Sequence, residues 1–189
     1  MSEAYEIEER RYTYADYREW ELKPGERYEL IYGEPYVMAA PNSRHQEILM
    51  ELSTQFHTFL RGKPCRVYPA PFDVRLYYKE DESDDTVVQP DISILCDKDK
   101  RGEEGCHGAP DLVVEIISPS NTATEMQQKF KLYQKAGVRE YWVVDPENKT
   151  LTVHLFQEDT IVGRIYGRSG TVRVSILPGF EIMLDEVFA

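Results

Sequence analysis

The chain of 189 residues lacks several features that define common classes of protein. No apolar run reaches the roughly 18 residues that a membrane span requires. The first eleven residues are polar and acidic, which is not typical of a signal peptide. The cysteines number only three, Cys65, Cys96 and Cys106, and without an export signal we expect all of them to be reduced. These absences favour a cytoplasmic protein without a membrane partner.

An excess of positive charge is also missing. The 22 lysines and arginines face 34 aspartates and glutamates, which gives a formal net charge of −12. Long-range attraction to DNA or RNA is therefore not expected, because such attraction depends on neutralising phosphates. A local basic patch or a bound divalent cation can reverse the local field, so the charge does not exclude a nucleic acid partner.

Three familiar catalytic or binding motifs do not occur. The chain has no glycine-rich phosphate loop and no Gly-x-Ser-x-Gly motif. Cys96, Cys106 and His107 lack the paired short spacings of a structural zinc site.

The residues that are present predict a single α/β domain spanning residues 1–189, with a mixed central sheet flanked by helices and a core in about residues 25–157. Ser43 with Gln46 and Thr122 with Glu125 fit capping boxes at the starts of two helices. Gly137 is expected to end the helix at residues 122–136. The predicted elements are a short helix at 14–20, a hairpin at 27–39, helices at 43–60 and 122–136, strands at 87–95, 111–117 and 140–145, and a C-terminal meander of strands at 151–156, 161–166 and 171–176.

Two carboxylates lie in or beside apolar strand-like runs. Glu115 sits inside residues 111–117, and a buried carboxylate costs several kcal/mol unless something compensates it. It therefore pairs with a basic group, lies at an exposed edge, or binds a hard cation such as Mg²⁺ or Mn²⁺. Asp91 belongs either to the polar face of a half-exposed strand or to the same metal site.

Four further residues are candidates for that site. At about 100° per residue, Lys129 falls on the inner face of its helix with Tyr133 one turn later. An inward lysine must pair with a carboxylate, extend to water or take part in catalysis. His45 lies in line with the apolar stripe of the helix predicted at residues 43–60. It is either a hydrogen-bonded core residue or a site residue. Glu34, at the hairpin turn, is a solvated turn acid or a third carboxylate.

Asp91, Glu115 and the lysine on the helix, in this order of elements, resemble the PD-(D/E)XK nuclease superfamily. More closely, the chain resembles the Uma2 family of restriction-endonuclease-like proteins. The matching segments hold in order and spacing from about residue 28 to residue 157. They are residues 28–34, Pro41 with His45, 89–91, 110–120, Lys129 with Tyr133, and 137–146.

Two positions depart from the expected pattern. The superfamily places a lysine two positions after the second acid, where this chain has Ile117. The resemblance implies that Lys129 replaces it, and the inward position of Lys129 on its helix agrees. The acid four residues before this lysine is Glu125, where aspartate is usual in the family.

The resemblance implies a restriction-endonuclease-like fold and an Mg²⁺- or Mn²⁺-dependent endonuclease that hydrolyses phosphodiester bonds, with DNA as the expected substrate. Asp91 and Glu115, helped by the carbonyl of Ile116, would hold the metal, and Lys129 would orient the nucleophile or offset charge. Glu34, His45 and Tyr133 would position the substrate or these groups. Cleavage of a duplex needs two sites, so a homodimer is expected, paired symmetrically through residues 151–176.

Two other functions stay open at this point. A binding or assembly module that keeps the nuclease fold without its activity is favoured by the net charge of −12. A metal-dependent phosphodiesterase that acts on small nucleotides also suits an acidic surface better than a long polyanion does.

Overall fold

The computed structural model describes residues 10–20, 26–119, 121–158 and 160–189. Its helices are α1 (Tyr14–Arg18), α2 (Ser43–Leu60), α3 (Ala123–Ala136) and α4 (Leu184–Val187), with a 3₁₀ turn η1 at Lys98–Lys100. Its strands are β1 (Arg27–Ile31), β2 (Glu34–Met38), β3 (Arg66–Pro69), β4 (Val74–Arg75), β5 (Val87–Val88), β6 (Ile92–Leu95), β7 (Cys106–His107), β8 (Leu112–Ile116), β9 (Glu140–Asp145), β10 (Thr150–Phe156), β11 (Ile161–Tyr166), β12 (Thr171–Arg173) and β13 (Glu181–Met183).

The strands form three sheets. The largest has the order β11-β10-β9-β8-β6-β3, the next has the order β2-β1-β5-β4-β7, and β12 pairs with β13. The large sheet is mixed, because β8 runs parallel to β9 and antiparallel to β6. This confirms the predicted α/β fold with a mixed central sheet.

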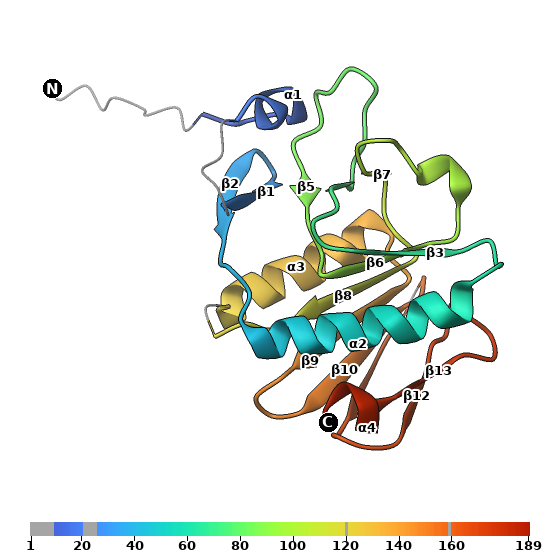
Figure 1. Cartoon of the computed structure of the whole chain (residues 1–189). Coiled ribbons are helices and arrows are strands. Elements are labelled where there is room, and N and C mark those ends of the chain that lie inside the picture. Colours follow the sequence, from blue (N-terminus) through green and yellow to red (C-terminus); the bar gives the residue numbers. More distant parts are fainter. Residues whose placement is uncertain (1–9, 21–25, 120, 159) are drawn as a thin grey trace, which may run out of the picture.

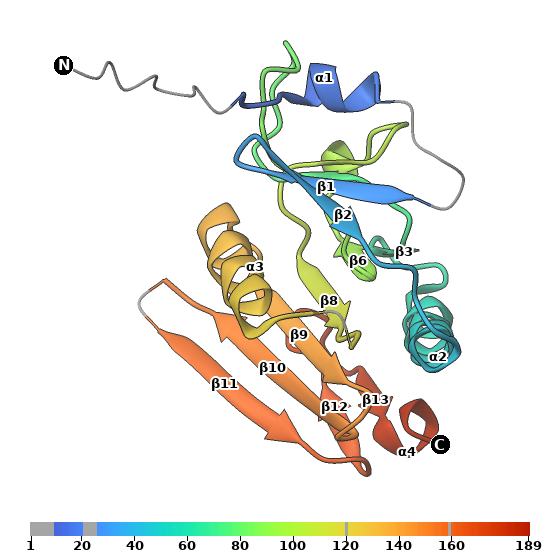
Figure 2. The ribbon, with the colours of Figure 1, turned by 90° about the vertical axis from the view of Figure 1, so that its left-hand side faces the viewer.

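Helices α2 and α3 cover opposite faces of the large sheet (Figures 1 and 2). Phe56 of α2 packs with Trp142 of β9 on one face, and Tyr133 of α3 packs with Tyr141 of the same strand on the other. All five residues of β8, Glu115 included, are buried, as expected for a strand covered on both faces of its sheet. No helix in the described part of the chain has the length and apolar character needed to cross a membrane.

The ends of α3 confirm the sequence prediction. Thr122 and Glu125 form a reciprocal capping box, and Gly137 ends the helix in the left-handed region at φ 91°. The cap of α2 differs by one residue, because Asn42 has the extended backbone of a cap and its side chain accepts from the His45 amide at 2.8 Å. Ser43 is already helical, so the predicted Ser43 cap is wrong.

The strand predicted at residues 87–95 is two strands. Residues 89–91 interrupt it, so that β5 joins the smaller sheet and β6 the larger. Pro90 has no amide hydrogen to donate to a ladder, which favours a break at this point. The segment nevertheless stays buried throughout, so the polar outer face considered for Asp91 does not exist.

The predicted C-terminal meander is only partly right. β10 and β11 pair as expected, but β12 pairs with β13 instead of continuing the large sheet. Val172 and Ile182 of this small hairpin are fully buried in the same core as Phe56. Burial of these apolar side chains against α2 therefore decides the path of the chain after β11.

Two of the three cysteines are joined. Arg66 of β3 lies opposite Leu95 of β6, and the preceding Cys65 therefore faces Cys96 across the ladder, where the two form a disulfide. The expectation of three reduced thiols is wrong for this pair. Cys106 is free and buried.

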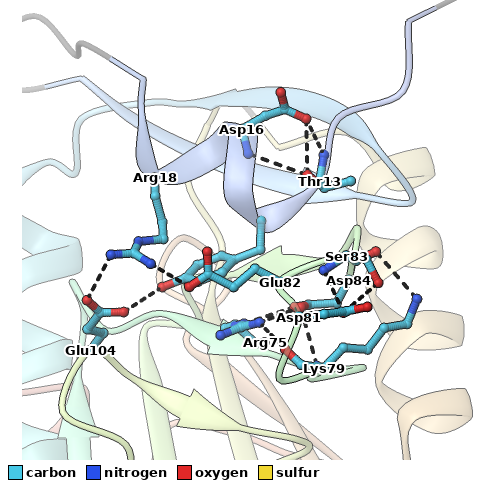
Figure 3. Close-up of polar contacts among 11 residues, drawn as sticks. Thr13, Asp16, Arg18, Arg75, Lys79, Asp81, Glu82, Ser83, Asp84 and Glu104 are labelled. Carbon is cyan, nitrogen blue, oxygen red and sulfur yellow. Dashed lines mark hydrogen bonds and ion pairs between the residues drawn. The ribbon is translucent and has the colours of Figure 1, made fainter.

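Helix α1 is fastened to the smaller sheet through polar contacts (Figure 3). Arg18 forms ion pairs with Glu82 and with Glu104, the latter at 3.4 Å. Beneath the helix, the buried guanidinium of Arg75 pairs with the buried carboxylate of Asp84, with Nε 2.9 Å from Oδ2. These contacts join α1 to loops of the smaller sheet, and they join strand β4 to the loop that precedes β5.

Replacing Phe56 with alanine is expected to lower the free energy of unfolding by about 3–5 kcal/mol, because it leaves a cavity in a rigid core. The ring of Phe56 is fully buried, 5.8 Å from that of Trp142 and 5.5 Å from that of Phe180. Urea unfolding would measure the change. Met50→Ala, at a side chain of the same helix that is 67% exposed, should change stability by no more than about 0.5 kcal/mol. Equal losses in the two variants would contradict this description of the core.

Candidate active site

A cavity of about 200 Å³ is lined by residues at the end of β8 and at the beginnings of α2 and α3. Figure 1 shows these three element ends at the same end of the large sheet. Strands β1 and β2 of the smaller sheet close the cavity from the other side. Its lining includes the buried side chains of Glu29, His45, Asp91 and Glu115, the nearly buried side chain of Lys129, and also the charged side chains of Arg27 and Glu125.

Asp91 and Glu115 meet because of the register between β6 and β8. Ile92 lies opposite Val114, so the next position along the ladder sets Asp91 opposite Glu115. Asp91 Oδ2 accepts from the Ile116 amide at 2.7 Å, which ties the carboxylate to the end of β8. His45 Nε2 lies 3.2 Å from Asp91 Oδ1. The break after β5 thus holds Asp91 at the point where the two sheets meet.

Lys129 lies between two carboxylates. Its side chain is only 11% exposed, and its Nζ lies 2.9 Å from Glu115 Oε1 and 3.0 Å from Glu29 Oε1. The Tyr133 hydroxyl, one helical turn later, donates to the same Glu115 oxygen at 2.6 Å. Of the three possibilities open for an inward lysine, the structure shows the pairing with carboxylates, and the wheel geometry correctly placed both side chains.

Burial and like charges shift the pKa values of these groups. Burial raises the pKa of Glu115 to about 7, and the nearby carboxylates of Glu29 and Asp91 act in the same direction against the opposing effect of Lys129. Burial works to lower the pKa of Lys129, but Glu115 and Glu29 more than offset it, so the net shift is upward and the ammonium stays charged. Burial also raises the pKa of Tyr133, which keeps its hydroxyl as a donor.

The structure brings together five of the six residues predicted for the site: His45, Asp91, Glu115, Lys129 and Tyr133. Glu34 stays outside the cavity. Its Oε1 pairs with Arg11 at 2.6 Å, and its Oε2 accepts from the Tyr36 hydroxyl at 3.0 Å.

Glu29 is the residue that the sequence analysis missed. It is 4% exposed, and besides Lys129 it accepts from the Gln89 amide at 2.9 Å. The signal was present, because Glu29 lies within the strand-like run 27–31 just as Glu115 lies within its own strand. The argument from the cost of a buried carboxylate applies equally to both.

The residues of this cavity fit a hard divalent cation. Glu29, Asp91 and Glu115 line the cavity as three buried carboxylates, and oxygen donors are what Mg²⁺ prefers. Within the described residues, no three or more His, Cys, Asp or Glu side chains form a group that could hold a metal ion. A cation held by two carboxylates and by water molecules is the usual arrangement for Mg²⁺.

Comparison with known proteins agrees with this fold. The sequence model of the Uma2 family, described as "Putative restriction endonuclease", matches residues 14–185. The chain belongs to the Uma2 family. The match spans all five of the predicted residues that the structure brings together.

Two proteins of Synechocystis are similar in sequence. The uncharacterized protein slr1290 is 30% identical over 118 residues, which cover 62% of this chain and 60% of that protein. The uncharacterized protein sll1609 is 25% identical over 136 residues, which cover 70% of this chain and 74% of that protein. The chain thus spans less than two thirds of the length of the first of these relatives.

A solved structure shares the fold. A crystal structure from Anabaena variabilis, described as "a putative nuclease belonging to DUF820", superposes with a TM-score of 0.74. The superposition covers 94% of this chain and 97% of that protein at 20% sequence identity. This superposition shows that the present chain has the restriction-endonuclease-like fold.

The stability of the metal-free protein should depend on Glu115. Between pH 4.5, the ordinary pKa of the group, and about 7, the native protein keeps a proton on Glu115 that the unfolded chain has lost. The contribution of this group to the free energy of unfolding therefore falls as pH rises through this window. We expect the Glu115→Gln variant to gain stability relative to wild type as pH increases from about 5 to about 8, measured by urea unfolding with a chelator present.

The exposed carboxylate of Glu47 provides the matched control for this measurement, since its side chain is 64% exposed. The pH dependence of unfolding of the Glu47→Gln variant should follow that of wild type. If the free energy of unfolding of the Glu115→Gln variant ran parallel to that of wild type across this pH range, the pKa of Glu115 would not be raised in the native state.

Proposed function

We propose that the protein is a metal-dependent endonuclease that hydrolyses phosphodiester bonds in DNA, through a site of the PD-(D/E)XK type. The observation that carries the proposal is the placement of Asp91 opposite Glu115 with Lys129 in contact with Glu115. This combines two carboxylates, which suit a divalent cation, with a fixed positive charge. Membership of the Uma2 family supports the same class of reaction.

Each side chain has a distinct part in this proposal. Asp91, Glu115 and the carbonyl of Ile116 would hold Mg²⁺ or Mn²⁺, which when bound lowers the pKa of a coordinated water and neutralises charge on the phosphate. Lys129 would orient the attacking water or offset negative charge on the phosphate. Tyr133 holds Glu115 in place by its hydrogen bond, and His45 holds Asp91.

Glu29 has a positioning part that the hydrogen bonds suggest. It contacts the Lys129 ammonium alongside Glu115, at 3.0 Å against 2.9 Å. With Glu115 serving as a metal ligand, Glu29 would keep the ammonium of Lys129 charged and in place. The excess of acids over bases in the cavity means that a divalent cation would relieve repulsion there.

A phosphodiesterase acting on small nucleotides is the second candidate. Two observations favour it: the cavity of about 200 Å³ is small, and the chain carries a net charge of −12. A short substrate needs fewer phosphate contacts than a duplex does. The two activities share Asp91, Glu115 and Lys129, so only the substrate separates them. Two copies of the chain would be needed to cut both strands of a duplex at one place.

Cleavage of supercoiled, linear and single-stranded DNA with Mg²⁺ or Mn²⁺ tests the first candidate. We expect the wild type to nick or linearise plasmid and the Glu115→Gln variant to lose this activity, because the glutamine amide cannot replace a carboxylate ligand. Activity on a chromogenic phosphodiester without activity on DNA would favour the small-nucleotide candidate. Unchanged cleavage by the Glu115→Gln variant would overturn the assignment of the site.

Titration calorimetry with Mn²⁺ separates an active site from a binding module that merely keeps the fold. We expect the wild type to bind the ion and the Asp91→Asn and Glu115→Gln variants to lose binding. Asp111→Asn is the control, because Asp111 lies at the other end of β8 and pairs with Arg139. The Lys129→Gln variant should bind Mn²⁺ at least as tightly as wild type yet cleave DNA about 10²–10³-fold more slowly. Absence of Mn²⁺ binding by the wild type would favour the binding module.

A further inference from the structure

Strand β11 forms an open edge of the large sheet. It pairs with β10 on one side, and no other described strand pairs with its outer side (Figure 2). Edge strands are usually protected by proline, by short length or by charge, since their unpaired backbone groups otherwise join another strand. The opposite edge, β3, has four residues and ends in Pro69, whereas β11 has six residues and no proline.

One face of β11 is apolar and exposed. Ile161, Gly163 and Ile165 alternate along the strand and so share that face. The two isoleucines are 43% and 76% exposed, and the glycine between them is also exposed. An open edge with two exposed isoleucines on one face is a surface that favours pairing with another strand.

We propose that β11 pairs antiparallel with β11 of a second copy of this chain, with the two-fold axis at Gly163, so that the two large sheets become one continuous sheet. In a two-fold symmetric contact the same surface patch is used by both copies. Along an antiparallel pair, directly opposite residues alternate between hydrogen-bonded and non-hydrogen-bonded pairs. Two symmetry-related pairs must be of the same kind, so one residue at the centre of the contact must lie opposite its own copy. The two-fold axis then passes between these two copies of the residue.

The register follows from the side chains. An axis at Gly163 sets Ile161 of each copy opposite Ile165 of the other, which covers both exposed isoleucines. An axis at Arg164 would set two arginines directly opposite each other, which is unfavourable. An axis at Val162 would leave Ile165 beyond the paired strands. With the axis at Gly163, Arg164 lies opposite Val162, which its aliphatic stem can cover.

Charges beyond the strand agree with this register. Pairing about Gly163 brings the turn that contains Glu158, before β11, next to Arg168 of the other copy, after its β11. The symmetry repeats this approach of opposite charges at both ends of the contact. The contact thus combines apolar complementarity at its centre with charge complementarity at its ends.

The contact is small, so the association should depend on protein concentration. A six-residue strand pair buries less than the standard interface of about 1,600 Å², and we expect a dissociation constant on the order of micromolar. The pairing does not rest on the proposed nuclease activity. If that activity holds, the dimer supplies the two sites that cleavage of both strands of a duplex requires.

Cysteine cross-linking tests the position of the axis. In the Gly163→Cys variant the two new thiols would face each other at a Cα separation of about 4.5–5.5 Å, within reach of a disulfide. A Cβ at this position meets nothing closer than 3.6 Å, from His154, so the site accepts a side chain. We expect diamide or a short bis-maleimide to convert the full-length variant to a covalent dimer.

Gly167→Cys is the matched control, because a Cβ there has open space and the residue lies four positions from the axis. Its two thiols would be roughly 27 Å apart along the strands at about 3.4 Å per residue, so it should not cross-link. Wild type controls for the native cysteines. Failure of Gly163→Cys to cross-link, or equal cross-linking of Gly167→Cys, would overturn the proposed register.

Analytical ultracentrifugation over a concentration series provides the second measurement. The wild type should approach twice its mass of 22.0 kDa as concentration rises, and Ile165→Lys should remain a monomer. Met50→Lys, at an exposed apolar side chain of α2, should dimerise like wild type. A wild type that stays monomeric well above the micromolar range, or an Ile165→Lys variant that dimerises equally, would overturn the proposal. Neither measurement depends on catalytic activity, so its outcome is separate from that of the nuclease assay.

Discussion

The ammonium of Lys129 lies between two carboxylates that belong to different sheets. Glu29 comes from β1 of the smaller sheet and Glu115 from β8 of the larger, while Lys129 itself belongs to α3. The elements β1, β8 and α3, which are far apart in the sequence, therefore meet at the buried charge of Lys129. A buried charge without a partner would be strongly destabilising. The cavity exists because this point lies where the two sheets meet.

The interruption at residues 89–91 serves the same junction. It lets one stretch of chain contribute β5 to the smaller sheet and β6 to the larger. The amide of Gln89 donates to Glu29, and Asp91 accepts from the amide of Ile116 on β8. The backbone and a side chain of the same three residues thus fasten both sheets to the cavity. This interruption places the carboxylate of Asp91 at the junction of the two sheets. A continuous strand there would only pair with its neighbours.

Physical reasoning from sequence predicted most of the fold and most of the residues that the structure brings together around the cavity, and its errors share a cause. Capping, helix faces and buried strands depend on neighbours a few residues away, so α2, α3 and β8 could be located and Lys129 turned inward. The position of Glu34 at the hairpin turn favours it as a third carboxylate of the site, and the same pattern gives no reason to prefer Glu29. Only the packing of α3 against β1 shows that the buried acid is Glu29.

The sequence by itself determined the residue types of the site, the faces on which they lie and the mixed α/β character of the domain, because these follow from local periodicity and from the cost of burying charge. Only the tertiary structure decided which carboxylate meets Lys129, that Cys65 faces Cys96, and that β12 leaves the large sheet for β13. Each of these depends on the pairing and packing of segments distant in the chain. Such contacts are selected by the burial of the whole core, which no local pattern encodes.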